Sequence, residues 1–292
     1  MLTINDVKFG RIEPSVEKVT LHASIWGFST LLEIHELPLV KQSFDKRIPL
    51  DKQFIEWYNQ GSMSACVGAS SAKLMATLNL PQIGAQQYDW REHYRWACKN
   101  DNDPQTSYKA DVGTYVWAGM DCLRKMGAYS VASGGFQLSH GIASYYWCSG
   151  SDVVDQMRTA IYYDRPLLFG VPWYEGWMDK IYQQPDGTWW LPKRSKWGKV
   201  VGGHAIMAPD ALDTLNAYAW ANTWGAGYPE RVHVPYEDAE YLMLQAGGEC
   251  AVGIDQEWTP EPEPEPESES IPFEISVEGE GTFTGTVVKA VA

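Results

Sequence analysis

The sequence predicts an α+β protein built from two subdomains, the first mainly helical and the second mainly an antiparallel β-sheet. Segments with apolar residues at helical spacing come first along the chain, and short segments rich in aromatic and β-branched residues follow. Helices and strands segregated in this way are typical of α+β proteins. The 292 residues, 45% of them hydrophobic, are enough for one large core or two packed lobes.

Four segments have the spacing of apolar residues that predicts helices: 67–80, 88–100, 114–127 and 153–164. The first is rich in alanine and follows Cys66 directly. We expect it to end before Pro81, because proline lacks the N–H group that a helix interior requires. The third reaches Gly127, a residue type that commonly closes a helix. The first half of the chain is therefore expected to be mainly helical.

Four later segments are rich in aromatic or β-branched residues and are bounded by glycine, proline, aspartate or asparagine: 166–173, 199–208, 216–224 and 251–258. Short segments of this kind are typical of strands. We therefore expect the second subdomain to be mainly β.

The beginning of the chain is harder to interpret than the middle. Residues 1–45 form an N-terminal extension, for which a packed structural extension and an inhibitory pro-segment both stay open. The predicted main domain spans residues 46–258. We expect it to be mainly helical over 46–150 and mainly β over 151–258.

The end of the chain changes composition abruptly. Residues 259–270 alternate Pro and Glu, which predicts an extended, self-repelling linker. Residues 271–292 alternate apolar and polar residues around a glycine-containing turn, which predicts a β-hairpin too small to fold alone. Two interpretations of this tail stay open: a tether to an assembly such as a virion, or a dispensable extension.

The formal net charge of −14 excludes several classes of partner. Binding to a phosphate backbone or to an anionic membrane needs clustered Lys and Arg, so we expect neither nucleic acid nor membrane as a partner. The first residues contain no apolar h-region, and no segment approaches the roughly 18 apolar residues of a membrane span. We expect no signal peptide and no transmembrane segment.

Five cysteines are scattered along the chain: Cys66, Cys98, Cys122, Cys148 and Cys250. Their odd number and the lack of a CxxC pair argue against a disulfide framework and against a zinc site. We therefore expect mostly free thiols, a location in the cytoplasm or in a virion, and neither a metal nor a cofactor.

Three separated residues could carry chemistry together. Cys66 lies where a polar loop meets a predicted helix, and the positive end of a helix dipole favours a thiolate. His204 follows two glycines on a predicted strand, and Asn222 ends the next predicted strand. Each residue alone has an ordinary structural explanation, as a buried thiol, a core histidine or a turn asparagine.

The segments around these residues resemble those of the papain-like cysteine peptidase family. Residues 59–66, Asn-Gln-Gly-Ser-Met-Ser-Ala-Cys, are similar to the family's nucleophile segment, in which Gln precedes Cys by six residues. Gly203-His204-Ala205 and residues 222–225, Asn-Thr-Trp-Gly, resemble its His-Ala and Asn-Ser-Trp-Gly motifs. The His follows the Cys by 138 positions and the Asn follows the His by 18, close to the known family spacing. The resemblance covers residues 46–258.

The resemblance implies a papain-like two-subdomain fold with an active-site cleft between a helical and a β subdomain. It implies cysteine peptidase activity on polypeptides, with Cys66 as nucleophile, His204 as base and acid, and Asn222 as the residue that orients the imidazole. The amide of Gln60 and the backbone N–H of Cys66 would form the oxyanion hole. Trp224 would cover the Asn–His hydrogen bond, and core packing is its equal alternative.

The segment Gly113-Thr114-Tyr115 resembles the family's cleft stretch, which binds the substrate backbone. Four positions depart from the family pattern: Met63 and Val67 around the nucleophile, Thr114 in the cleft stretch, and Gly203 before the histidine. These departures are typical of divergent bacterial or viral members. The change at Thr114 leaves the depth and the side-chain preference of the cleft open.

Two other functions stay open on the same residues. One is acyl transfer or cross-linking through the same thioester, and the other is a non-catalytic structural or binding protein, for example in a virion, that retains the cleft. The remaining histidines are expected to be structural or surface residues: His22, His35, His93, His140 and His233. Two interpretations stay open for Trp173 and Tyr174: a place at the border of the substrate site, or core packing, which we favour.

Overall fold

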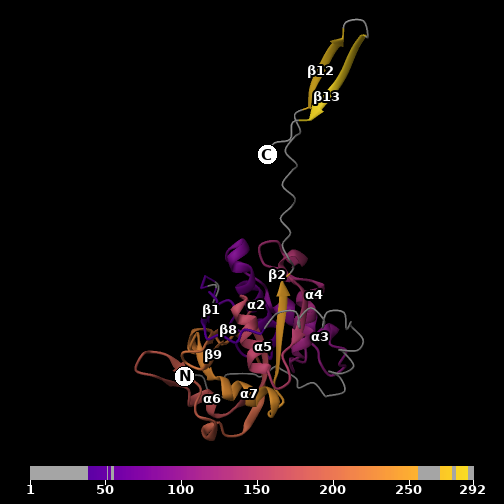
Figure 1. The fold of residues 1–292 in the computed structure, drawn as a ribbon. Helices are drawn as coiled ribbons and strands as arrows, with labels where there is room; N and C mark the ends of the chain where they lie inside the picture. Colours follow the sequence, from indigo (N-terminus) through magenta and orange to yellow (C-terminus); the bar gives the residue numbers. More distant parts are fainter. Residues whose placement is uncertain (1–38, 51, 54–55, 256–269, 278–280, 289–292) are drawn as a thin grey trace. The chain divides into compact units, whose positions relative to one another are not determined.

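The structure, a computed structural model, describes residues 39–50, 52–53, 56–255, 270–277 and 281–288 (Figure 1). The chain divides into two units after Gln256. Most of the N-terminal extension and nearly all of the Glu-Pro linker lie outside the described residues, so the predictions made for them stay predictions.

Four helices occupy the segments in which the sequence predicts them: α2 (Cys66–Ile83), α3 (Trp90–Asn100), α4 (Val116–Lys125) and α5 (Val153–Tyr162). The predicted end of the first helix before Pro81 is wrong, because α2 continues through the proline to Ile83. Proline in a last turn removes one backbone hydrogen bond, and its fixed φ is compatible with a helix. The helix then closes at Gly84, whose N–H donates to the carbonyl of Leu80 over 3.1 Å.

The predicted closure at Gly127 is visible in the backbone. Its φ is +76°, and its N–H donates to the carbonyl of Leu123 over 3.1 Å. A Cβ atom at this position would lie 1.8 Å from the carbonyl oxygen of Gln137. Glycine is therefore required here both by the backbone conformation and by the space.

A nine-stranded sheet forms the other half of the larger unit, in the order β4-β11-β5-β8-β9-β10-β7-β6 with β1 also on β8. Its strands are β1 (Asp45–Arg47), β4 (Ile142–Trp147), β5 (Leu167–Tyr174), β6 (Tyr182–Gln183), β7 (Trp189–Trp190), β8 (Val200–Leu212), β9 (Ala217–Ala221), β10 (Val232–Pro235) and β11 (Glu249–Asp255). All pairs are antiparallel except β10 with β7. The four predicted strands are β5, β8, β9 and β11, so the expected α+β class is confirmed.

The segregation of helices and strands is less complete than the sequence predicts. Strand β4 comes from the first half of the chain and pairs with β11, whereas α6 (Gly176–Asp179) and α7 (Tyr236–Leu244) belong to the second half. The remaining short elements are β2 (Ala128–Ser130), β3 (Gly135–Gln137) and the 3-10 turns η2 (Leu138–His140), η3 (Arg194–Lys196) and η4 (Gly225–Gly227).

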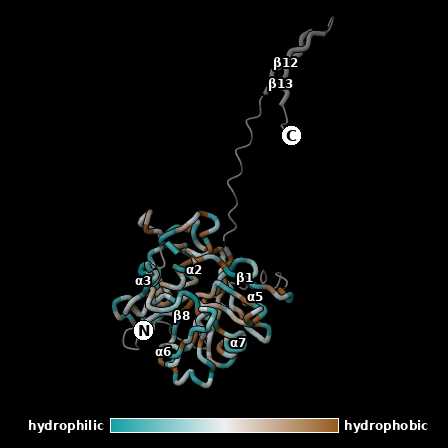
Figure 2. Tube along the Cα trace, turned by 90° about the vertical axis from the view of Figure 1, so that its left-hand side faces the viewer, coloured by the Kyte–Doolittle hydropathy of each residue, from teal (hydrophilic) through white to brown (hydrophobic). Residues whose placement is uncertain are grey.

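Two main buried clusters fill the larger unit. One surrounds α2 with side chains of α3 and α4, and it includes Ala205 and Met207 of β8. The other lies on the sheet beneath α5, α6 and α7 and is rich in tryptophan. In Figures 1 and 2, α6 and α7 lie below α2 and α3. Because α2 packs against β8, the N-terminus of the first helix is fixed next to the strand that carries His204.

The second unit is described only by its two strands. β12 (Ser270–Val277) and β13 (Gly281–Val288) pair antiparallel, with Ile271 opposite Val287 and Ile275 opposite Phe283. These strands lie in the segment for which the sequence predicts a hairpin. The proposed tether role of the tail stays a prediction.

Candidate active site

Cys66 is the first residue of α2, and its side chain lies against β8. The backbone N–H of Ala205 donates to Cys66 Sγ over 3.3 Å. One helical turn further on, the hydroxyl of Ser70 donates to the carbonyl of Ala205 over 2.9 Å. Side chains of α2 thus bind both backbone groups of the residue that follows His204, which fixes the sulfur beside the imidazole strand.

His204 and Asn222 form a buried pair between β8 and the end of β9. His204 Nε2 and Asn222 Oδ1 lie 2.8 Å apart. The backbone N–H of Thr223 donates to the same Asn222 Oδ1 over 2.8 Å, so this atom is an acceptor and His204 Nε2 carries the hydrogen. In the neutral ring, the basic nitrogen is then Nδ1.

Aromatic side chains enclose the imidazole. The ring centroid of His204 lies 4.7 Å from that of Trp173, edge-on, and 4.8 Å from that of Trp224. Burial lowers the pKa of His204 to about 4, and the hydrogen bond with Asn222 opposes this shift. The imidazole is therefore neutral near pH 7 and suited to accept a thiol proton.

Gln60 is held by several hydrogen bonds, two of them to Thr223, the residue after Asn222. Its backbone N–H donates to the carbonyl of Thr223 over 2.9 Å, and its Oε1 accepts from the Thr223 hydroxyl over 2.8 Å. Its Nε2 donates one of two hydrogens to the carbonyl of Met63 over 2.9 Å. These bonds define which end of the amide is the donor.

Thr223 is a residue of this site to which the sequence assigns no role. Its N–H holds Asn222, and its carbonyl and hydroxyl hold Gln60. It therefore connects the two amides that the sequence places in the orienting and oxyanion roles. Its place inside the Asn-Thr-Trp-Gly motif was the available signal.

Trp173 was expected in the core, and it is buried, but it also contacts the imidazole. It lies opposite Gly202 across the β5–β8 pair, and Pro172 lies opposite Gly203. Glycine at 202 leaves room beside the strand because it has no Cβ atom. Trp224 is also buried and contacts His204, and its covering role stays a prediction.

The predicted cleft stretch lies just before α4. Thr114 donates to a carboxylate oxygen of Asp101 over 2.7 Å, and Tyr115 donates to Asp103 over 2.6 Å. Gly113 has a φ of +101°. Both side chains are bound to the loop after α3, and the backbone N–H of Gly113 donates to the hydroxyl of Tyr94 over 3.1 Å. The role of the stretch in substrate binding stays a prediction.

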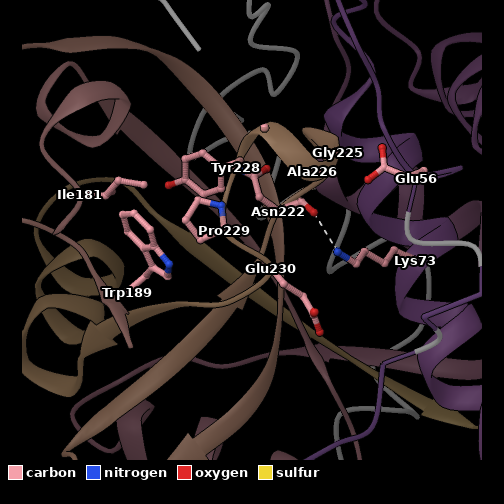
Figure 3. Close-up of a pocket in the computed structure, with 11 residues that line it drawn as sticks. Glu56, Lys73, Ile181, Trp189, Asn222, Gly225, Ala226, Tyr228, Pro229 and Glu230 are labelled. Carbon is pink, nitrogen blue, oxygen red and sulfur yellow. Dashed lines mark hydrogen bonds between the residues drawn. The ribbon is translucent and has the colours of Figure 1, made fainter. Parts of the chain in front are cut away.

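A cavity of about 590 Å³ lies next to the pair (Figure 3). Asn222, Lys73 and Glu230 line one part of it, and Trp189, Tyr228 and Ile181 line another. Among the described residues, no group of three or more His, Cys, Asp or Glu side chains is arranged to hold a metal ion. Within the same residues, no helix has the length and apolar character of a membrane span.

The central groups are fully enclosed. Cys66 and His204 both have 0% of their surface exposed. A polypeptide therefore reaches the sulfur only if neighbouring residues move.

The fold is that of the papain-like cysteine proteases, which confirms the predicted architecture. Xylellain, a cysteine protease from Xylella fastidiosa, is 15% identical, with a TM-score of 0.53 over 88% of this chain and 94% of its own. Procathepsin L 3 of the Tenebrio molitor larval midgut is 13% identical, with a TM-score of 0.50 over 75% and 71%. A recombinant stem bromelain precursor is 14% identical, with a TM-score of 0.50 over 85% and 77%. No family model and no curated protein matches the sequence.

Two buried neutral histidines predict a loss of stability in mild acid. His93 on α3 accepts the backbone N–H of Tyr129 at Nε2 over 2.9 Å, and burial lowers its pKa to about 3. The ordinary value of 6.5 holds in the unfolded chain. The unfolded state thus binds more protons below pH 6.5, so each of His93 and His204 should remove about 2 kcal/mol of unfolding free energy between pH 7 and pH 5.

Urea unfolding at both pH values measures this loss. His93→Gln keeps an acceptor for Tyr129 and does not titrate, so its pH dependence should be shallower by about 2 kcal/mol. Equal pH dependence in the wild type and the variant would contradict the assignment of His93 as a neutral buried acceptor.

Proposed function

We propose that this protein is a cysteine peptidase that cleaves peptide bonds through an acyl-enzyme on Cys66. The observation that carries the proposal is the contact of Cys66 Sγ with the backbone of Ala205, next to the buried His204–Asn222 pair. A thiol at a helix N-terminus beside a neutral imidazole is the arrangement that activates a cysteine nucleophile.

In the first step, His204 Nδ1 takes the thiol proton and the sulfur attacks the carbonyl carbon of the substrate. A C–S bond forms, and negative charge develops on the carbonyl oxygen. The second hydrogen of Gln60 Nε2 and the backbone N–H of Cys66 would donate to this oxyanion. An α-helix has no internal acceptor for the N–H groups of its first turn, which suits Cys66 to this role.

In the second step, His204 returns the proton to the leaving amine as the C–N bond breaks, which leaves a thioester. A water molecule then gives a proton to His204 and attacks the thioester carbonyl, and the C–S bond breaks to regenerate the thiol. Asn222 keeps the imidazole in the orientation that both steps require.

Selective covalent labelling tests this proposal. A peptidyl epoxide at pH 7 should modify one thiol per chain, and mass spectrometry should locate it at Cys66. Burial raises the pKa of Cys98 to about 12, and that of Cys122 and Cys250 also lies above the ordinary value, so these thiols should stay unmodified.

Because Cys66 is enclosed, labelling by a large reagent and by a small one should be compared. Iodoacetamide, a small neutral reagent, should modify the same thiol at pH 7, and denatured protein should label at all five cysteines. Failure of both reagents at Cys66, or equal labelling of all thiols in the folded protein, would overturn the proposal. Addition of a primary amine during peptide cleavage distinguishes hydrolysis from acyl transfer by its products.

A further inference from the structure

A buried lysine lies on the same helix as the proposed nucleophile. Lys73 follows Cys66 by seven residues on α2 and is 5% exposed. Its Nζ donates to the backbone carbonyl of Asn222 over 2.8 Å (Figure 3). Burial of an ammonium group is costly, and an apolar side chain of similar length would pack in its place at lower cost. The lysine therefore calls for an explanation other than packing.

The acceptor of this bond belongs to the peptide group that joins Asn222 and Thr223. The carbonyl of that peptide accepts from Lys73, and the N–H of the same peptide donates to Asn222 Oδ1. Asn222 Oδ1 in turn accepts from His204 Nε2. A continuous series of hydrogen bonds thus runs from the ammonium group through one peptide plane and one carboxamide to the imidazole, and bonds in such a series strengthen one another.

We propose that Lys73 is a positioning residue for the reaction proposed above. Its ammonium group holds the peptide between Asn222 and Thr223, and through it holds the Asn222 carboxamide at His204. The inference rests on the proposed function for its kinetic consequences, and on the hydrogen bonds alone for its structural ones.

The ammonium group of Lys73 is mostly charged at neutral pH, although burial disfavours the charge. Burial lowers the pKa of Lys73 to about 8, the charge of Glu230 opposes the shift, and that of Arg231 adds to it. Glu56 lines the same cavity. Figure 3 shows Lys73 reaching Asn222 from one side, with Tyr228 and Pro229 on the other.

Lys73→Met tests the proposal because methionine keeps much of the length and volume and removes the donor. With protein concentration set by active-site titration, we expect kcat to fall about tenfold, since one charge-assisted hydrogen bond is lost, and KM to stay within about twofold. Lys99→Met makes the same change at an exposed position of α3 and should leave both constants unchanged. Lys73→Gln retains a neutral donor, so its kcat should lie between that of Lys73→Met and that of the wild type. It replaces Lys73→Met as the test if the methionine variant does not fold.

A double-mutant cycle with Asn222→Ala separates positioning from general damage. If Lys73 acts through the Asn222 carboxamide, Lys73→Met should lower kcat in the wild type and have no further effect in the Asn222→Ala background. An equal loss in both backgrounds, or no loss in the wild type, would overturn the proposal.

A readout without substrate keeps this inference distinct from the proposed function. The His204 Nε2–H proton should exchange slowly in NMR spectra of the wild type and at least about tenfold faster in Lys73→Met. If the wild type cleaves no peptide, the peptidase proposal fails while this comparison still decides the role of Lys73. Equal exchange rates would exclude it.

Discussion

Replacing Cys66 with alanine is expected to lower kcat/KM for peptide cleavage by at least about 10⁴-fold and to leave the fold intact. The sulfur supplies the bond to the acyl group, and neither His204 nor Gln60 provides a substitute nucleophile in the proposed mechanism. Residual catalysis from the oxyanion hole and from binding is small, as in other enzymes of the triad type. Steady-state cleavage of a peptide library by the purified variant measures the loss.

The fold should tolerate this substitution because only one buried atom is removed. We expect the free energy of unfolding to change by about 1 kcal/mol, the scale of a small cavity. Cys98→Ala is the matched control: its thiol is also buried, donates to the carbonyl of Gly113 over 3.8 Å, and has no part in the proposed mechanism. Equal turnover by wild type and Cys66→Ala would end the assignment of the nucleophile.

The helices and central strands could be predicted because the spacing of apolar residues along each segment shows which faces are buried. α3, α4 and α5 present apolar residues at helical intervals, and β5 is apolar along its length because it is buried on both faces. Strand β4 was not predicted because its pairing partner, β11, lies about a hundred residues later in the chain. The continuation of α2 through Pro81 to Ile83 could not be predicted, because proline removes a backbone donor and usually ends a helix.

The sequence predicts only those residues of the candidate site that lie in recognisable motifs. Cys66, His204, Asn222 and Gln60 lie in short segments whose order and spacing are recognisable without coordinates. The importance of Lys73 comes from a single contact between residues 149 positions apart. The contact of Trp173 with His204 likewise depends on the pairing of β5 with β8, which no local pattern specifies.

The second large effect is expected at Gln60. Gln60→Ala should lower kcat by about 10²–10³-fold and change KM far less, because a donor to the oxyanion contributes mainly in the transition state. Gln60→Glu should be at least as damaging, since it keeps an acceptor for the Thr223 hydroxyl and replaces the donor with a negative charge. Steady-state kinetics on one peptide substrate measure both variants.

Thr223 provides the matched test of how the Gln60 amide is oriented. Thr223→Val removes the hydroxyl that donates to Gln60 Oε1 and keeps both backbone bonds, so we expect a loss in kcat of about tenfold. Thr223→Ser restores the hydroxyl and should restore the rate. We therefore expect kcat to be highest in the wild type, lower in Thr223→Val and lowest in Gln60→Ala. A change confined to KM in Gln60→Ala would contradict the oxyanion role, because a donor that acts on developing charge must alter the chemical step.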